Sequence, residues 1–185
     1  MRRFEASDTA VVVVDVQEKL AGAMPPPMLA DVTRSATLLL EACAVLGAHA
    51  IATEQYPRGL GHTIAPLAER LAELRVHAIE KMCFSACESA GFERAFAASR
   101  ARAAVVVGME THVCVFQTVR ELCARGVPVL VPIDGVASRR ADHRDVGLEL
   151  CRQVGATVTT TETIVFDWLR VAGTDAFKRL SKLIR

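Results

Sequence analysis

The chain has 185 residues, of which 51% are hydrophobic, and its 22 basic and 21 acidic residues give a net charge of +1 at pH 7. This length allows one domain over residues 1–185 whose core needs no metal ion or disulfide. The near-neutral charge argues against nucleic-acid binding, and no apolar run reaches the roughly 18 residues of a membrane span. Six scattered cysteines indicate reduced thiols, and the N-terminal segment has no signal-peptide cleavage site, so we expect a cytoplasmic protein.

The first third of the chain predicts two strands separated by a helix. Residues 11–16 are mostly β-branched, which is typical of a strand buried on both faces, and polar side chains follow only at its end. Three prolines at 25–27 predict a break, and from 28 to 47 apolar residues recur at helical spacing. Residues 49–53 predict a second strand, and the glycines and proline of 54–61 predict a loop.

The rest of the chain continues this alternation. Further strands are predicted at 76–81, 103–107, 127–133 and 156–160, and further helices at 93–102, 113–124, 141–154, 162–171 and 175–184. Pro132 has no backbone donor, so we expect it where its strand leaves the sheet. Strand–helix alternation without repeats or linkers predicts an α/β protein with one open parallel sheet.

Three side chains suited to catalysis follow strands of this sheet. Asp15 and Lys81 end the first and third strands, and Cys114 follows the turn that Gly108 permits after the fourth. Because ligands bind beyond the carboxyl ends of parallel strands, we expect all three at one edge of the sheet. A thiol at a helix start, near an ammonium such as Lys81, would favour the thiolate.

This set of residues fits attack on a carbonyl or amide carbon. Asp15 could accept the proton of Cys114 and later return it to a leaving amine. Backbone N–H groups of the turn could stabilise a developing oxyanion.

Each of these residues also has an ordinary structural explanation. A lone cysteine is often a small buried hydrophobe, and an aspartate at a strand end is often a turn former. Two other classes of protein therefore stay open. One is a binding or scaffold protein that keeps the fold without the chemistry. The other is a nucleotide-binding domain. The sequence QEKL at 17–20 argues against it, because a nucleotide-binding domain would have a glycine-rich turn there.

The segments around these residues resemble the isochorismatase-like cysteine hydrolases over about residues 8–184. They are VVVVDVQEKL with Asp15, IEKMCFSA with Lys81 and VVVGMETHVCVFQTVREL with Cys114. TEQYPRGLG, DGVASRR and FKRLSKLIR are most similar to the isochorismatase domain-containing branch.

The resemblance has implications for the fold, the catalytic residues and the assembly. It implies a Rossmann-like three-layer fold with a six-stranded parallel sheet, and a homo-oligomer. It makes Cys114 the nucleophile, Asp15 the base and Lys81 the supporting lysine. It also implies a cis peptide between Met109 and Glu110, and an oxyanion hole formed by the backbone N–H groups of Glu110 and Cys114.

The chain departs from the family's nicotinamidases at their metal site. Those proteins carry an Asp-x-His pattern after the second strand, where this chain has Thr53-Glu54-Gln55-Tyr56 followed only by His62. One imidazole with one carboxylate makes a poor metal site, so we predict no metal and no cofactor and disfavour nicotinamidase. A C-x-x-x-C pair at Cys83 and Cys87 has no second pair to complete a zinc site.

The expected substrate is a small molecule with an amide-like C–N bond, hydrolysed through a thioester. Isochorismate hydrolysis cleaves a vinyl ether, and family members that catalyse it need not use a cysteine. Cys114 therefore points toward amide-like substrates, and an isochorismate-type hydrolase is kept as an alternative. Gln17, Tyr56, Phe84 and His112 flank the three catalytic candidates in sequence and are the candidates for the substrate pocket.

Overall fold

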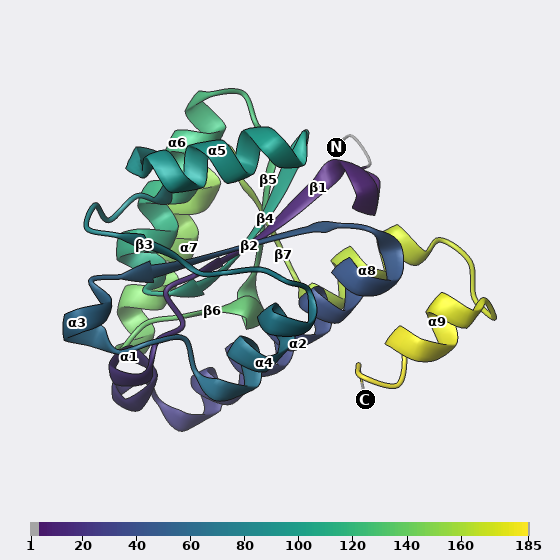
Figure 1. The fold of residues 1–185 in the computed structure, drawn as a ribbon, viewed down its shortest axis with the longest axis horizontal. Coiled ribbons are helices and arrows are strands. Elements are labelled where there is room, and N and C mark those ends of the chain that lie inside the picture. The colour runs from purple at the N-terminus through teal and green to yellow at the C-terminus, as the bar shows by residue number, and fades with distance from the viewer. Residues whose placement is uncertain (1–3, 185) are drawn as a thin grey trace.

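The computed structural model describes residues 4–184, which form a parallel sheet between two layers of helices (Figure 1). Its strands are β1 (Thr9–Val14), β2 (His49–Gln55), β3 (Ile79–Lys81), β4 (Ala103–Met109), β5 (Val129–Pro132), β6 (Val136–Ala137) and β7 (Thr157–Thr159). The order is β3-β2-β1-β4-β5-β7, with β6 beside β4, and every pairing is parallel. The predicted α/β class and parallel sheet are confirmed. A two-residue strand such as β6 is too short to show a periodicity, and the sequence did not predict it.

Nine α-helices lie within the described residues. They are α1 (Glu18–Ala23), α2 (Pro26–Leu46), α3 (Pro57–Leu60), α4 (Ala65–Glu73), α5 (Ala90–Ser99), α6 (Phe116–Ala124), α7 (Ala141–Gln153), α8 (Thr161–Leu169) and α9 (Asp175–Leu180). None of the helices in residues 4–184 is long and apolar enough to cross a membrane.

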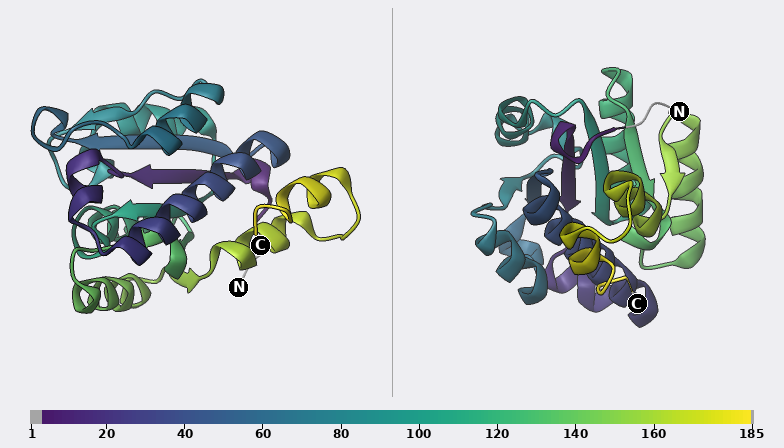
Figure 2. Two further views of the ribbon diagram at one scale, coloured as in Figure 1. Left: turned by 90° about the horizontal axis from the view of Figure 1, so that it is seen from below. Right: turned by 90° about the vertical axis from the view of Figure 1, so that its right-hand side faces the viewer.

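The helices cover the sheet in two groups, because alternate side chains of a strand face opposite sides. Val11 and Val13 of β1 pack in one cluster with α2, α4, α8 and α9, whereas Val12 and Val14 pack in a second cluster with α5, α6 and α7. Figure 2 shows these two layers, with α8 and α9 on the side of α2. Strand β1 is therefore buried on both faces, as its β-branched composition predicts.

Three expectations from the sequence need correction. The break expected at the prolines 25–27 is shorter than predicted: Met24 and Pro25 separate α1 from α2, but Pro26 and Pro27 already open α2, where the first turn needs no N–H donor. The expected loop at 54–61 contains the end of β2 and the short helix α3. The third strand covers only Ile79–Lys81. Pro132 is the last residue of β5, as expected.

Candidate active site

A buried ion pair connects the ends of β1 and β3. Lys81 Nζ lies 2.7 Å from Asp15 Oδ2, and both side chains are 0% exposed. Because β2 lies between the two strands and neighbouring strands are about 4.8 Å apart, only a long side chain such as lysine can span this distance. Lys81 also donates to the carbonyl oxygens of Cys83 at 3.3 Å and Phe84 at 3.0 Å. The ammonium is therefore held by partners on two segments.

Strand β2 completes the hydrogen bonding of this pair. The Thr53 hydroxyl donates to Asp15 Oδ1 at 2.7 Å, and the Gln55 side-chain oxygen accepts from Lys81 Nζ at 2.8 Å. Thr53 and Gln55 are two residues apart on β2, so their side chains lie on the same face of the sheet. In the sequence these two residues stand out only as departures from a metal pattern. Their spacing of two on the strand between the two charged residues was the available signal.

The Cys114 thiol is buried beside this pair. Cys114 is 6% exposed and lies in the π-helical turn Thr111–Val115, which precedes α6. Strand β4 reaches the turn through Gly108, whose φ is +125° and where an added Cβ would lie 2.0 Å from the Val14 carbonyl oxygen. Only glycine fits there. The Thr118 hydroxyl donates to the Cys114 carbonyl at 2.7 Å and fixes the turn to α6.

The surroundings of Cys114 differ from those that would favour a thiolate. Burial raises the pKa of Cys114 to about 12, and the charge of Asp15 raises it too, while Lys81 lowers it by less. Cys114 also lies within a π-helical turn, and not at the start of a regular α-helix. Burial and the neighbouring Asp15 therefore favour the neutral form of the Cys114 thiol.

The backbone before Cys114 forms a compact turn. The peptide bond between Met109 and Glu110 is cis, as the family resemblance implies. The Glu110 carbonyl accepts the N–H groups of Val113 at 3.0 Å and Val115 at 3.3 Å. The proposed oxyanion donors, Glu110 and Cys114, thus belong to one hydrogen-bonded turn.

The predicted pocket residues occupy different environments. Gln17 is fully buried, its amide nitrogen donates to the carbonyls of Gln55 at 3.0 Å and Gly61 at 2.7 Å, and its oxygen accepts the Gln55 N–H at 2.7 Å. Its polar atoms hold loops together and are not presented to a substrate. Tyr56 and Phe84 are about half exposed, at 47% and 54%, on the loops that follow β2 and β3.

His112 is half-buried in the turn of Cys114. Its Nδ1 lies 3.0 Å from the Ser138 hydroxyl, and its ring lies 4.7 Å, centroid to centroid, from that of His143 on α7. Burial lowers the pKa of His112, the Glu110 carboxylate opposes this, and His143 and Arg139 lower the pKa further. The imidazole is consequently neutral near pH 7.

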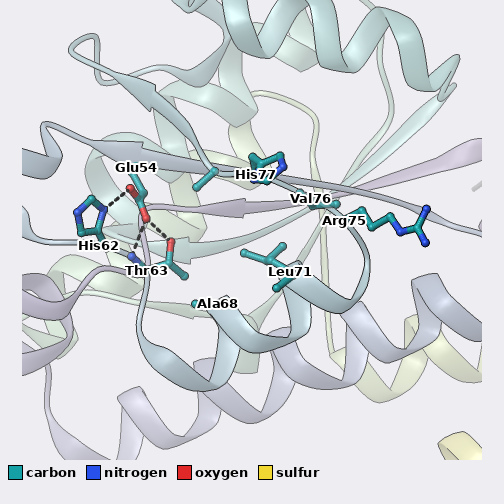
Figure 3. Close-up of a pocket in the computed structure, with 10 residues that line it drawn as sticks. Glu54, His62, Thr63, Ala68, Leu71, Arg75, Val76 and His77 are labelled. Atoms are coloured by element: carbon teal, nitrogen blue, oxygen red, sulfur yellow. Dashed lines mark hydrogen bonds and ion pairs between the residues drawn. The ribbon is translucent and has the colours of Figure 1, made fainter.

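A cavity of about 520 Å³ lies elsewhere, on the opposite side of β2. Figure 3 shows Glu54, His62 and Thr63 at one end and Arg75 at the other, with Leu71 and Val76 among the apolar lining. Neither Cys114 nor Lys81 lines it.

The carboxylate at the end of this cavity is already occupied by protein donors. Glu54 Oε1 accepts the Thr63 N–H at 2.7 Å and hydroxyl at 2.8 Å, and Oε2 lies 3.0 Å from His62 Nδ1. Among the residues that the structure describes, no three His, Cys, Asp or Glu side chains gather as a metal site would require. The prediction that the protein needs no metal remains a prediction.

Comparison with known proteins places the chain in a family. The model of the isochorismatase domain matches residues 9–163, and the chain belongs to this family, whose members are generally hydrolases. It is 34% identical over 155 residues to isochorismatase family protein 1A of Dictyostelium discoideum, covering 83% of this chain and 75% of the relative.

Two further relatives match nearly the whole chain. Isochorismatase domain-containing protein 2 of Bos taurus is 31% identical over 99% of this chain and 86% of its own length. A protein of Phytophthora sojae described as a secreted isochorismatase effector is 32% identical over 99% of this chain and 87% of its own length. The predicted family and its isochorismatase domain-containing branch are confirmed.

Solved structures of related proteins have the same fold. A protein of Caenorhabditis elegans described as MAR1 ribonuclease superimposes with a TM-score of 0.90 at 34% identity, covering 99% of this chain and 92% of that one. The Escherichia coli YcaC protein, described as an octameric hydrolase of unknown specificity, has a TM-score of 0.87 over 98% of this chain and 90% of that one. At 19% identity, YcaC supports the fold alone.

Proposed function

We propose that the protein is a cysteine hydrolase that cleaves an amide-like C–N bond of a small molecule through a thioester on Cys114. The observation that supports this most directly is the ion pair of Asp15 and Lys81, fully buried and adjacent to the thiol. A buried ion pair seldom adds to stability, because desolvating two charges costs about as much as their attraction returns. Ionisable groups buried together beside a nucleophile are typical of active sites.

The raised pKa of Cys114 supports Asp15 as the group that removes its proton. Since the thiol is neutral at rest, the Asp15 carboxylate removes its proton as the sulfur attacks the carbonyl carbon. The N–H groups of Glu110 and Cys114 stabilise the oxyanion. Asp15 then protonates the leaving nitrogen, and the C–N bond breaks to leave a thioester. Water, deprotonated by Asp15, hydrolyses the thioester and restores the thiol.

Lys81 holds the base in place. Its ammonium is bound to Asp15, Gln55 and two carbonyl oxygens, so it holds the carboxylate in one orientation during both proton transfers. It also offsets the negative charge that appears on sulfur when the thiol is deprotonated.

The test is a panel of small amides, ureido acids and isochorismate, assayed with wild-type protein and with Cys114→Ala. We expect Cys114→Ala to lose at least about a thousandfold in kcat/KM. The control is Cys123→Ala, which removes a partly buried thiol of α6 and should retain full activity. A thioester on Cys114, trapped by acid quench and located by peptide mass spectrometry, would support the mechanism. Full activity of Cys114→Ala on a confirmed substrate would refute it.

RNA cleavage is a second candidate, because the C. elegans protein at 34% identity is described as a ribonuclease. The net charge of +1 counts against an RNA-binding surface. An RNA oligonucleotide therefore belongs in the same panel. Cleavage that Cys114→Ala abolishes would favour this candidate, whereas binding without turnover of any substrate would favour a scaffold protein.

We also propose a cytoplasmic homo-oligomer. All six cysteines are unpaired, which fits a reducing compartment, and the YcaC neighbour is octameric. Light scattering coupled to size-exclusion chromatography tests the assembly, and an elution mass near 20 kDa would contradict it.

A further inference from the structure

The segment after β6 contacts the Cys114 turn at two of its residues, Glu110 and His112. Arg139 binds the Glu110 side chain, and Ser138 lies 3.0 Å from His112 Nδ1. Building on the proposed function, we propose that Arg139 is a positioning residue, which holds the Glu110 peptide and the Cys114 turn in the geometry that acyl transfer requires. Arg139 touches none of the reacting groups and acts through Glu110.

The contact between Arg139 and Glu110 is made by three donors. Glu110 Oε1 accepts the Arg139 backbone N–H at 3.2 Å and Nε at 3.0 Å, and Oε2 accepts Nη2 at 3.2 Å. Paired guanidinium donors fix the plane of a carboxylate as well as its position. The backbone N–H of Arg139 is also a donor, so both carboxylate oxygens of Glu110 accept hydrogen bonds from the segment that follows β6.

The burial of this pair is one-sided. The Glu110 side chain is 9% exposed, whereas that of Arg139 is 60% exposed. A carboxylate removed from water depends on its donors, because an unpaired buried charge is costly. Glu110 therefore has a strong preference for one orientation, and that orientation is set by Arg139.

Other segments hold the rest of the turn in place, so Arg139 positions only the part around Glu110. Helix α7 packs directly on the turn. A Cβ added at Gly147 would lie 2.8 Å from both the backbone nitrogen of His112 and the carbonyl carbon of Thr111. Thr118 binds the Cys114 carbonyl from the other end. Releasing Glu110 would free the start of the turn while its end stays fixed.

Arg140 is a natural control within the same loop. It is the next residue, has the same charge and also binds a carboxylate with two donors, Nε to Asp142 Oδ1 at 3.0 Å and Nη2 to Oδ2 at 2.7 Å. Both partners of that pair are exposed, at 66% and 60%, and their side-chain hydrogen bonds are made to each other and to the His143 N–H, outside the turn. Arg140→Ala thus removes an equal charge without releasing Glu110.

The experiment measures hydrogen–deuterium exchange of peptides covering residues 109–118 in wild type, Arg139→Ala, Arg139→Lys and Arg140→Ala. In Arg139→Ala we expect amides of the turn to exchange at least about tenfold faster while β1 and β5 stay protected. Arg139→Lys keeps the charge but loses the paired donors, so it should restore protection only in part. Arg140→Ala should match wild type. Unchanged exchange in Arg139→Ala, or faster exchange spread evenly over the chain, would overturn the proposal.

Turnover separates this inference from the proposed function. On a confirmed substrate, Arg139→Ala should lower kcat by about tenfold to a hundredfold and change KM by less than about threefold, since a misplaced turn affects the transition state. A larger change in KM than in kcat would also overturn the proposal. If wild-type protein hydrolyses no substrate, the proposed function fails, and the exchange measurement still decides whether Arg139 positions the turn.

Discussion

The two faces of β2 carry two polar sites that differ in how they meet water. Thr53 and Gln55 face the Asp15–Lys81 pair, in which both side chains are 0% exposed. Glu54, between them in sequence, faces the cavity of Figure 3, where its histidine partner is 75% exposed. Water screens the charges of the second site and cannot reach those of the first. Removing one partner should therefore have a large effect at the face of the Asp15–Lys81 pair and a small one at the cavity face.

The largest expected effect follows from breaking the buried pair. Lys81→Met leaves Asp15 buried without its cation and should lower the free energy of unfolding by about 3–5 kcal/mol, measured by urea denaturation. The double variant Lys81→Met/Asp15→Leu should regain most of this stability but no activity, because it removes the unpaired charge and the base together. If Lys81→Met is as stable as wild type, the pair is not buried as described.

The next largest effect is expected where β4 packs against the end of β1, at Gly108. Gly108→Ala places a methyl group against the Val14 carbonyl in a backbone conformation that alanine avoids, so it should cost at least about 3 kcal/mol of unfolding free energy. Gly47→Ala is the matched control, because Gly47 also has a positive φ, +79°, but has open space around it. It should cost about 1 kcal/mol. Equal losses in the two variants would contradict close packing at Gly108.

A smaller effect concerns the thiol, and it can be measured without a substrate. With a pKa of about 12, Cys114 should react with iodoacetamide only at alkaline pH, above the value of about 8.5 for a free thiol. Because Asp15 raises the pKa and Lys81 lowers it, Asp15→Asn should speed alkylation at pH 8 by about tenfold or more, and Lys81→Met should slow it. Cys123, followed in the same peptide digest, should react alike in all three proteins. Rapid alkylation of Cys114 in the wild-type protein below pH 8 would contradict the raised pKa and support the thiolate expected from the sequence.

The smallest effect is expected at the cavity face. The Glu54 carboxylate raises the pKa of His62 above 6.5, so the contact stabilises the fold below that pH and is lost as pH rises through the folded-state pKa. His62→Ala should lower stability slightly at pH 5.5 and not at pH 8. An NMR titration should show the His62 midpoint falling toward 6.5 in Glu54→Gln, and an unchanged midpoint would mean that the two groups do not interact.

The sequence by itself determined where six strands of the sheet end to within about two residues. Continuous β-branched runs and helical spacing are local patterns, so they predicted the parallel sheet and placed Asp15, Lys81 and Cys114 at its carboxyl edge. The motifs around those three residues indicated the family. The helices α1, α3 and α4 were not predicted. Helices α1 and α3, of six and four residues, are too short to show a period, whereas α4 has buried leucines at 67 and 71, a helical spacing that was available in the sequence.

Only the tertiary structure decided what surrounds the three residues. Strand β2 lies between Asp15 and Lys81 and supplies Thr53 and Gln55 to them. This follows from the strand order, which no local pattern encodes. The raised pKa of Cys114 and the attachment of Glu110 to Arg139, 29 residues away, likewise depend on which distant segments exclude water from a group. Periodicity reports the face on which a side chain lies, whereas its charge state and its partners are set by burial, which is a property of the whole fold.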